Sequence, residues 1–447
     1  MDSGVKYGSI IIILIFFSAV PAFADTFDLD ECIALALEKN SELEQSKIDL
    51  DAALRATRRK WANFLPAISI SGGVSYSDML FGDPSAVGGF SPAAGSSSPF
   101  DFSVGFSLSL PLNAGVAQEM KRTDITLESS RINNEMVKEQ IVLQVKKAFY
   151  SLLTQRENLE LLKENVRLSE EQLEKAESNY ENGLVSERVL LQSRLGLENT
   201  RVNFNQKQLE YENQKRDFFS LLGLEADKEI KLAGEIELQI VDFDAEKLIE
   251  TYLLQRKDIM ALQKGIKLLE NSIVQTKRYT KTPSVTLSGR WTGTIQNPFQ
   301  DSLNFGLTLS VPIDSLIPGS KDDQEIEALE DDLKKNRIRL DDTIRTARLS
   351  IKNLVARLKS AEESIRLSEM QIDISTRYYE LAEEGFKFGT VERLELEQAR
   401  QDLLNAKQQL LAVEHQYTLI QLDLLSALNL QDLSGISQGA HTNEAEK

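Results

Sequence analysis

The chain has 447 residues, and its 51 Lys and Arg against 69 Asp and Glu give a net charge of −18. This acidic balance argues against a nucleic-acid binder, which needs a basic face to replace counterions. One cysteine and two histidines exclude an intramolecular disulfide and leave little material for a metal or catalytic cluster. The 10 prolines are few enough to allow long uninterrupted helices.

Residues 1–24 have the pattern of a secretory signal peptide. Lys6 supplies the positive flank, residues 10–17 are apolar, and Ala22 to Ala24 form a small-x-small cleavage site. The apolar run is shorter than the roughly 20 residues of a spanning helix, so an uncleaved anchor is the weaker alternative. The pattern predicts export from the cytoplasm. Cys32 lies in an acidic context and is predicted to be a buried or idle thiol rather than a lipid-attachment site.

The rest of the chain contains two similar repeats. Apolar residues recur every seven positions in both halves, on either side of Gly183 and Gly389, and each second-half position follows its partner by 206 residues. The paired series are Val145, Leu152, Leu159, Val166, Leu173 and Tyr180 with Ile351, Leu358, Ile365, Ile372, Tyr379 and Phe386, then Leu190, Leu197, Phe204, Tyr211 and Phe218 with Leu396, Leu403, Leu410, Tyr417 and Leu424. A common offset over two helices and the glycine between them indicates an internal duplication, and the seven-residue period predicts helices that supercoil around neighbours.

Each repeat is predicted to contain a helix, two strands, a very long helix, a glycine turn and a return helix. The first repeat occupies 25–222, with a helix at about 28–64, strands at about 66–77 and 101–112, and a long helix at about 115–182. The second occupies 244–430, with a helix at about 245–281, strands at about 283–295 and 303–314, and a long helix at about 321–385. The linker 223–243 contains a small strand or hairpin within 229–238, and 431–447 is a polar tail predicted to be disordered.

The four strands alternate apolar residues with small polar ones. Phe102, Val104 and Phe106, for example, alternate with serine and glycine. Strands of about ten residues with this pattern are typical of a membrane β-barrel with a wet interior; a soluble sheet resting its apolar face on a core is the alternative. Four strands cannot close a barrel, and open edges in lipid leave backbone groups unpaired. Several chains must therefore combine: two would give eight strands, and three would give twelve with room for a passage.

With this organisation the sequence resembles the TolC-like outer membrane efflux protein family from about Phe27 to Leu430. The resemblance is carried by the duplication, by the aromatic-x-x-Gly turns at 180–183 and 386–389, and by Leu222-Gly-Leu224 and Leu428-Asn-Leu430 at the ends of the return helices. It implies a mostly α-helical homotrimer with a 12-stranded β-barrel, four strands per chain, continuing into a long α-helical coiled-coil barrel. It also implies partners: outer membrane lipid, a periplasmic adaptor protein, and an inner-membrane pump or ABC transporter.

The resemblance also suggests where the pore is narrowest. Where the family has two aspartates after the second turn glycine, this chain has Glu395 and Gln398, with Glu392 nearby. Three carboxylates converging on an axis would repel each other and attract cations. The alternative is that these glutamates are ordinary solvated residues at a helix start, where negative charge is favourable. The turn residues predicted for the gate and for adaptor docking are Tyr180, Gly183, Val185, Phe386, Gly389 and Val391.

The sequence therefore predicts the outer-membrane exit duct of a tripartite efflux or type I secretion system, located in the outer membrane of a Gram-negative bacterium and reaching into the periplasm. No catalytic, cofactor-binding or metal residue and no cofactor is expected, because no nucleophile lies in a recognisable set with a base. The alternative function is a trimeric coiled-coil spacer without a passage. The generic Ser, Thr and Gly of the polar strand faces do not identify the cargo.

Overall fold

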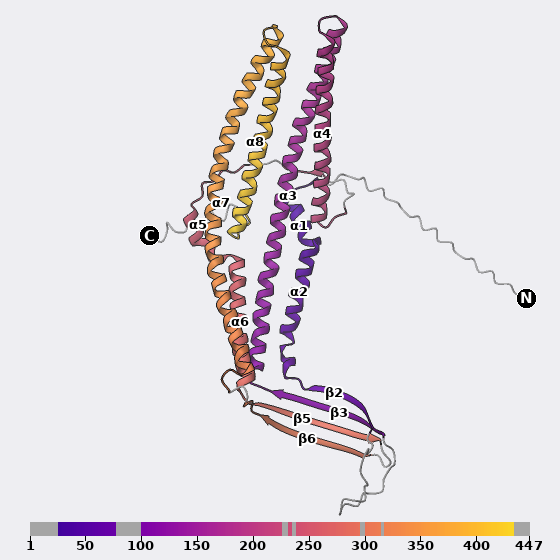
Figure 1. The fold of residues 1–447 in the computed structure, drawn as a ribbon, viewed down its shortest axis with the longest axis vertical. Coiled ribbons are helices and arrows are strands. Elements are labelled where there is room, and N and C mark those ends of the chain that lie inside the picture. The colour runs from indigo at the N-terminus through magenta and orange to yellow at the C-terminus, as the bar shows by residue number, and fades with distance from the viewer. Residues whose placement is uncertain are drawn as a thin grey trace, which may run out of the picture. The chain divides into compact units, whose positions relative to one another are not determined.

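A computed structural model describes residues 26–76, 100–225, 231–234, 238–295, 300–313 and 317–432. The chain divides into two compact units, Met1–Ala36 with Ala148–Glu237, and Leu37–Lys147 with Leu238–Lys447. Within the described residues the order of elements repeats as expected, with a helical segment, two strands, a very long helix and a return helix in each half (Figure 1).

The first half contains β1 (Thr26–Phe27), α1 (Leu29–Lys39), α2 (Ser41–Arg58), the 3-10 helix η1 (Lys60–Phe64), β2 (Ala67–Tyr76), β3 (Phe100–Leu112), α3 (Val116–Glu181), α4 (Glu187–Leu221) and β4 (Lys231–Leu232). The second half contains α5 (Ala245–Tyr252), the 3-10 helix η3 (Leu253–Gln255), α6 (Lys257–Lys281), β5 (Ser284–Ile295), β6 (Gln300–Ser310), α7 (Lys321–Lys387) and α8 (Arg393–Ala427). At 66 and 67 residues, α3 and α7 are close to 100 Å long, at about 1.5 Å per residue.

The strands of both repeats form one antiparallel sheet in the order β2-β3-β5-β6, with β3 joined to β5 across the repeat boundary (Figure 1). Its registers place the apolar residues of neighbouring strands on one face: Trp291 lies opposite Phe106 on one side and Leu303 on the other. This apolar face is open, and Ile70 and Phe305 are 79% and 80% exposed. A sheet that covered a soluble core would bury such residues.

The helical hairpins have two kinds of seam. Away from the turn, the core of α7 and α8 is built from large residues of the predicted heptads, such as Ile351, Leu358 and Leu424. Closer to the turn, the deeply buried positions are a second heptad of small residues. They are Ser368, Ser375 and Ala382 on α7, and Ala399 and Ala406 on α8. Small side chains let two helices approach closely, so this half of the hairpin is held by close backbone packing.

The segment that precedes α5 packs against the end of this core that lies away from the turn. Tyr417 is 1% exposed, and its hydroxyl donates to the Gln239 carbonyl at 3.4 Å, while the Gln421 amide donates to the same oxygen at 3.1 Å. Phe243 and Leu248 pack against the same buried cluster. The end of the linker that precedes α5 is therefore part of this core.

The other unit holds the start of the chain against the linker. β1 and β4 pair in parallel, and Arg156 of α3 donates to the carbonyls of Leu232 and Gly234 at 2.8 Å each. Cys32 in α1 is fully buried, which confirms the prediction of a buried thiol, and burial, followed by the charges of Asp28 and Glu31, raises its pKa to about 12. A thiol this hard to ionise is chemically inert.

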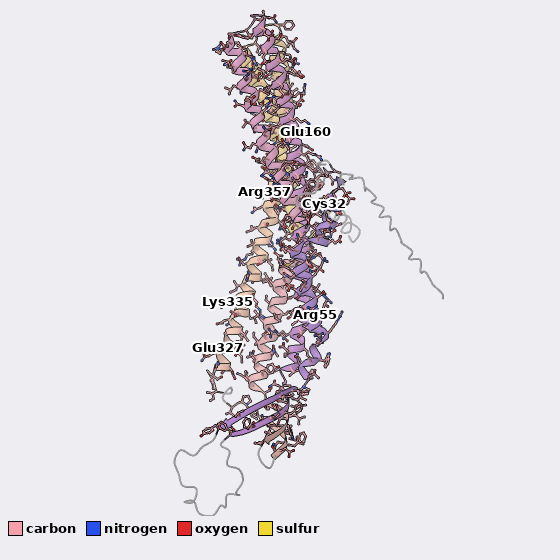
Figure 2. The ribbon with its side chains drawn as sticks, turned by 90° about the vertical axis from the view of Figure 1, so that its right-hand side faces the viewer. Cys32, Arg55, Glu160, Glu327, Lys335 and Arg357 are labelled. Carbon is pink, nitrogen blue, oxygen red and sulfur yellow. The ribbon has the colours of Figure 1, made fainter. Side chains whose placement is uncertain are left out.

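The long helices carry their charges on the outside. Glu327, Lys335 and Arg357 of α7 are all exposed (Figure 2). The acidic pair Asp331 and Asp332 binds Lys334 and Lys335 one turn along the same helix. These carboxylates form a solvated helix face rather than a site.

Three predicted elements differ from the structure. The helix at 28–64 is broken, because the Asn40 side chain caps a new helix by accepting from Glu42 and Leu43, and residues 60–64 are 3-10. The helix at 245–281 is interrupted by η3 and restarts after Arg256. β6 spans 300–310 instead of 303–314. Within 229–238 the described residues include the short strand β4, paired with β1, which agrees with the small strand of the prediction. The signal peptide, the first strand loop and most of the tail, from residue 433, lie outside the described residues.

A search of the helices in the described ranges finds none with the length and apolarity that a membrane-crossing helix requires.

Candidate functional site

The turn of the second hairpin is closed by backbone hydrogen bonds around two glycines. Gly389 has a φ of 75°, the left-handed conformation that glycine adopts most easily. Its N–H donates to the Phe386 carbonyl at 3.1 Å, and the Thr390 N–H donates to the Gly385 carbonyl at 2.8 Å. These bonds satisfy the last carbonyls of α7 and reverse the chain into α8.

The first hairpin turns in the same way 206 residues earlier. Gly183 has a φ of 71°, its N–H donates to the Tyr180 carbonyl at 2.9 Å, and the Leu184 N–H donates to the Asn179 carbonyl at 2.8 Å. The far ends of the return helices also match, with a left-handed residue at Gly223 and at Asn429. The turn glycines predicted from the sequence therefore have the predicted conformation.

Gly385 is a turn residue that sequence reasoning missed. A Cβ built at this position would lie 2.5 Å from Cγ2 of Val391, closer than two carbon atoms can approach. The equivalent residue of the first hairpin is Asn179, so the constraint belongs to the second turn alone. It places Val391, one of the predicted turn residues, directly against the last turn of α7.

Glu395 lies in the first turn of α8, on the exposed side of the hairpin. The hydroxyl of Tyr378, on α7, donates to Oε1 of Glu395 at 3.3 Å. Desolvation, and then the Glu395 carboxylate, raise the pKa of that hydroxyl. The structure thus brings one further residue to the predicted constriction, and sequence spacing gave no signal for Tyr378 because it lies on the other helix.

The neighbours of Glu395 differ in what they bind. The Gln398 amide donates to Asp402 at 3.1 Å along α8, and Glu392 is an exposed N-cap residue whose side chain caps nothing. Glu397 forms an ion pair with Arg400 at 3.0 Å. Of the three predicted constriction residues, Glu395 alone is held by the facing helix through a hydrogen bond in the structure.

Two arginines near these glutamates, Arg393 and Arg400, are partly covered by the protein. Arg393 is half-buried, and burial lowers the pKa of its guanidinium although the Glu397 carboxylate opposes the shift. Arg400 is largely covered as well, with 13% of its side chain exposed. Glu397 therefore compensates buried arginines, and Glu395 is the acid whose charge faces outward.

Large apolar residues are exposed at both turns. Leu184 is 73% exposed in the first, and Phe388 and Leu394 are 76% and 77% exposed in the second. Phe386 and Tyr180, which the sequence selected, are less exposed, at 44% and 41%. Exposed apolar residues at a turn are typical of a surface that another protein covers.

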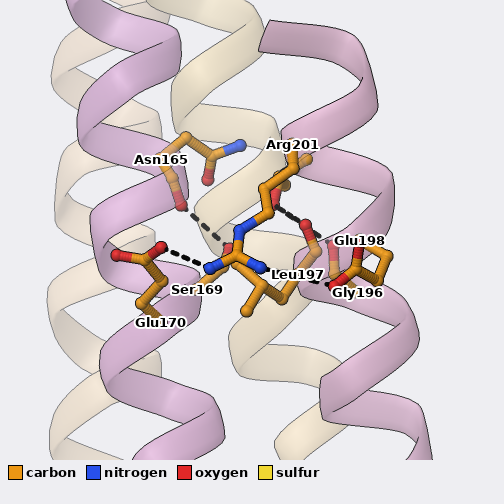
Figure 3. A network of polar contacts seen from close by, with 8 residues as sticks. Asn165, Ser169, Glu170, Gly196, Leu197, Glu198 and Arg201 are labelled. Atoms are coloured by element: carbon orange, nitrogen blue, oxygen red, sulfur yellow. Dashed lines mark hydrogen bonds and ion pairs between the residues drawn. The ribbon is translucent and has the colours of Figure 1, made fainter. Parts of the chain in front are cut away.

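The first hairpin is tied across its two helices by charge. Arg201 of α4 pairs with Glu170 of α3 at 2.8 Å and with Glu198 of its own helix at 3.4 Å (Figure 3). Beside it, the buried Ser169 hydroxyl donates to the Asn165 carbonyl at 2.9 Å. The first hairpin also lacks an acidic residue at the position equivalent to Glu395, where it has Val189.

The described residues show little that could perform catalysis. They contain no group of three or more His, Cys, Asp and Glu side chains placed to hold a metal ion. His415 is a half-buried residue of α8, and burial lowers its pKa; no neighbouring acid orients it as a base. The features that the fold does build are an exposed apolar sheet and long hairpins with patterned turns.

A four-stranded sheet with an exposed apolar face, joined to helices near 100 Å long, has the architecture of a membrane channel with a helical extension. The chain belongs to the outer membrane efflux protein family, whose sequence profile matches residues 32–224 and 248–430. The two matched segments correspond closely to the two repeats.

Individual proteins agree with this assignment. The antibiotic efflux pump outer membrane protein ArpC of Pseudomonas putida is 24% identical over 403 residues, and the toluene efflux pump outer membrane protein TtgC of the same species is 24% identical over 414 residues. Each match covers 86% of this chain and 79% of the relative. Among solved structures, the Campylobacter jejuni CmeC outer membrane channel matches with a TM-score of 0.75 and 20% identity, covering 92% of this chain and 89% of that one. The open-state Neisseria gonorrhoeae MtrE channel matches with a TM-score of 0.71 and 16% identity, covering 90% and 89%.

These findings confirm the predicted fold class, which is that of the trimeric outer membrane channels, and the predicted resemblance. They also confirm an efflux channel of the outer membrane that extends into the periplasm, and they favour it over a spacer without a passage. The family is one of channels rather than enzymes. The domain boundaries and the roles of Glu395, Gln398, Glu392 and the turn residues stay predictions.

Proposed function

We propose that three copies of this chain form the exit duct of a tripartite efflux system, receiving cargo from an inner-membrane transporter and releasing it outside the cell. The observation that carries the proposal is the open sheet. β2 and β6 are its edge strands, and its apolar face is exposed. In lipid, each unpaired backbone group at such an edge costs several kcal/mol, so the edges of different copies must pair.

Three copies fit a duct better than two. Two would give an eight-stranded barrel, whose interior is about filled by side chains, whereas twelve strands leave space along the axis. The polar face of small Ser, Thr and Gly residues is suited to line that space with water. The names of the relatives mention antibiotics and toluene, which favours small molecules over polypeptides as cargo.

Glu395 is proposed as the charged ring of the constriction. Its carboxylate is exposed and held by Tyr378 at 3.3 Å, so three copies around an axis would present three oriented negative charges. Gln398 would add a neutral ring one turn further along α8, and Glu392 lies at the start of the same helix. Such a ring attracts cations, and its self-repulsion favours opening.

The two turns are proposed as the docking surface for a periplasmic adaptor. The candidate residues are Tyr180, Gly183, Val185, Phe386, Gly389 and Val391, to which the structure adds the exposed Leu184, Phe388 and Leu394. The duct itself would perform no chemistry and hold no cofactor. The free energy for transport would come from the inner-membrane pump or ABC transporter on which the adaptor sits.

Ion conduction by the purified assembly in planar bilayers tests this function. We expect single-channel currents with a preference for cations, and we expect Glu395→Gln to reduce that preference. Glu187→Gln is the matched control, because it makes the same chemical change in the first turn of α4. Absence of current from the wild-type assembly would contradict the duct and favour a spacer, and an unchanged ion preference in Glu395→Gln would exclude Glu395 as the selective ring.

A further inference from the structure

One charged side chain stands in the middle of the polar face of the sheet. Arg290 of β5 lies opposite Ser107 of β3 and Asn304 of β6. Its neighbour Trp291 belongs to the apolar face, so alternation along the strand places Arg290 on the polar one. Arg290 lies six residues after the start of β5 at Ser284 and five before its end at Ile295, which is close to mid-strand.

The surroundings of Arg290 are neutral. The polar-face positions around it on the four strands are small and uncharged: Ser69, Ser71, Ser103, Gly105, Ser107, Ser109, Thr286, Ser288, Thr292, Ser302, Asn304, Gly306 and Thr308. Among the described residues no carboxylate pairs with Arg290, whose side chain is exposed. Within the described part of the sheet, the serines and threonines around Arg290 give its charge no structural role.

A described acid on the neighbouring strand lies in the other register. Asp301 of β6 is opposite Gly293, and the indole N–H of Trp291, on the apolar face, donates to its Oδ2 at 3.5 Å. Asp301 is therefore not a partner of Arg290 on the polar face.

We propose that Arg290 is a specificity-determining residue: three copies form a positively charged ring halfway through the barrel, which favours anionic cargo. The inference rests on the proposed trimeric duct. The chain as a whole carries a charge of −18, which repels anions, and the ring reverses that effect where the passage crosses the membrane. A guanidinium also presents a planar pair of donors that matches carboxylates and phosphates, the groups such cargo would carry.

The ring gives the duct charges of opposite sign at two depths. Glu395 would be negative at the constriction, and Arg290 positive in the barrel. A pore with oppositely charged segments passes current more easily in one direction, because one polarity fills it with ions and the other depletes it. The wild-type assembly should therefore rectify, and both Arg290→Ser and Glu395→Gln should reduce the rectification.

The direct test is the reversal potential of the assembly in a KCl gradient, measured with Glu395→Gln as the background so that the constriction does not mask the barrel. We expect the Glu395→Gln assembly to be more permeable to chloride than to potassium. Adding Arg290→Ser should lower the chloride-to-potassium permeability ratio by about two- to tenfold, from Coulomb energies in water at roughly 8 Å. In 1 M salt, where the Debye length falls to about 3 Å, the difference should nearly vanish.

A relocated charge provides the control for misfolding. Thr292 lies on the same face, opposite Gly105 and Ser302. Arg290→Ser combined with Thr292→Arg moves the ring about 7 Å along the strand and should restore the chloride preference.

The possible failures are distinguishable. No current from the wild-type assembly would contradict the duct itself. Normal conductance with the same permeability ratio before and after Arg290→Ser would overturn the ring and leave the duct intact. A loss of chloride preference that Thr292→Arg does not restore would also count against the ring, because it would trace the effect to local structure instead of charge.

Discussion

The two hairpins have the same backbone and different side chains at their turns. The two backbone hydrogen bonds that close the turn at Gly183 recur at Gly389, where the Val391 N–H also donates to the Gly385 carbonyl at 3.3 Å. Yet Val189 in the first hairpin corresponds to Glu395 in the second, and Asn179 corresponds to Gly385. The comparison teaches that the duplication supplied the architecture, while the ring chemistry proposed for the constriction belongs to the second copy alone.

The hairpins also differ in how their helices are tied. In the first, Arg201 reaches across to Glu170; the equivalent residues of the second are Lys407 and Thr376, which form no ion pair with each other. Exposed ion pairs contribute only about 0–1 kcal/mol to stability, so this difference between the hairpins has a small energetic effect. The first hairpin thus has an ion pair between its helices at a position where the second has none.

The largest effect is expected where the repeats share a buried position. Phe218 and Leu424 are equivalent and are 2% and 0% exposed. Truncation to Ala should cost about 3–5 kcal/mol for Phe218 and about 2–5 kcal/mol for Leu424, seen as a lower thermal midpoint. Lys335→Ala, on the exposed face of α7, should change little. A near-neutral effect at either buried position would break the structural equivalence of the repeats.

A smaller effect is expected at the turn, where the repeats differ. Gly385→Ala places a methyl group against Val391 and should cost about 1–3 kcal/mol locally. Faster hydrogen exchange of the Thr390 amide would report it, and adding Val391→Ala should restore protection. Asn179→Ala in the first hairpin is the matched control and should leave the equivalent Leu184 amide unchanged. Equal effects at both turns would remove the distinction drawn between them.

The smallest change in stability is expected at two exposed ion pairs, one that joins α3 to α6 and one that joins α7 to α6. Lys264 lowers the pKa of Glu128, and Lys277 lowers the pKa of Glu330, through a hydrogen bond and then charge. A carboxylate with a lowered pKa in the folded state stabilises it above the ordinary value of 4.5, and this contribution is lost as pH falls through the folded value.

Glu128→Gln tests this contribution. The variant should lower the thermal midpoint at pH 7 by an amount corresponding to less than about 1 kcal/mol. The wild type and the variant should converge as pH falls below the lowered folded-state pKa of Glu128, where the side chain is protonated in both the folded and the unfolded state. A gap between them that stays constant with pH would show that the ion pair is not its source.

Much of the fold could be predicted because it depends on periodicity. The 206-residue offset, the heptads and the alternating strands each follow from burying one face of a regular element. The break at Asn40 was missed because a single capping side chain overrode a continuous pattern. The small-residue seam through Ser375 and Ala399 was missed because alanine and serine carry no apolar signal that distinguishes a close helix contact from a surface.

The site was less predictable for a related reason. Glu395 could be selected by its spacing from Gly389, and Gly389 by its turn. Tyr378 and Gly385 could not, because their roles depend on contacts between α7 and the start of α8 that no local pattern encodes. Arg290 was visible as a polar-face residue of an alternating strand, but its isolation emerged only from the pairing of β5 with both neighbours.

The account depends most on the closure of a four-stranded sheet by three copies. The mass of the intact assembly, extracted from outer membranes and measured by native mass spectrometry, tests this directly. We predict a species containing three chains and no stable folded monomer. A particle of two or four chains, or a monomer that stays folded and soluble without detergent, would contradict the account.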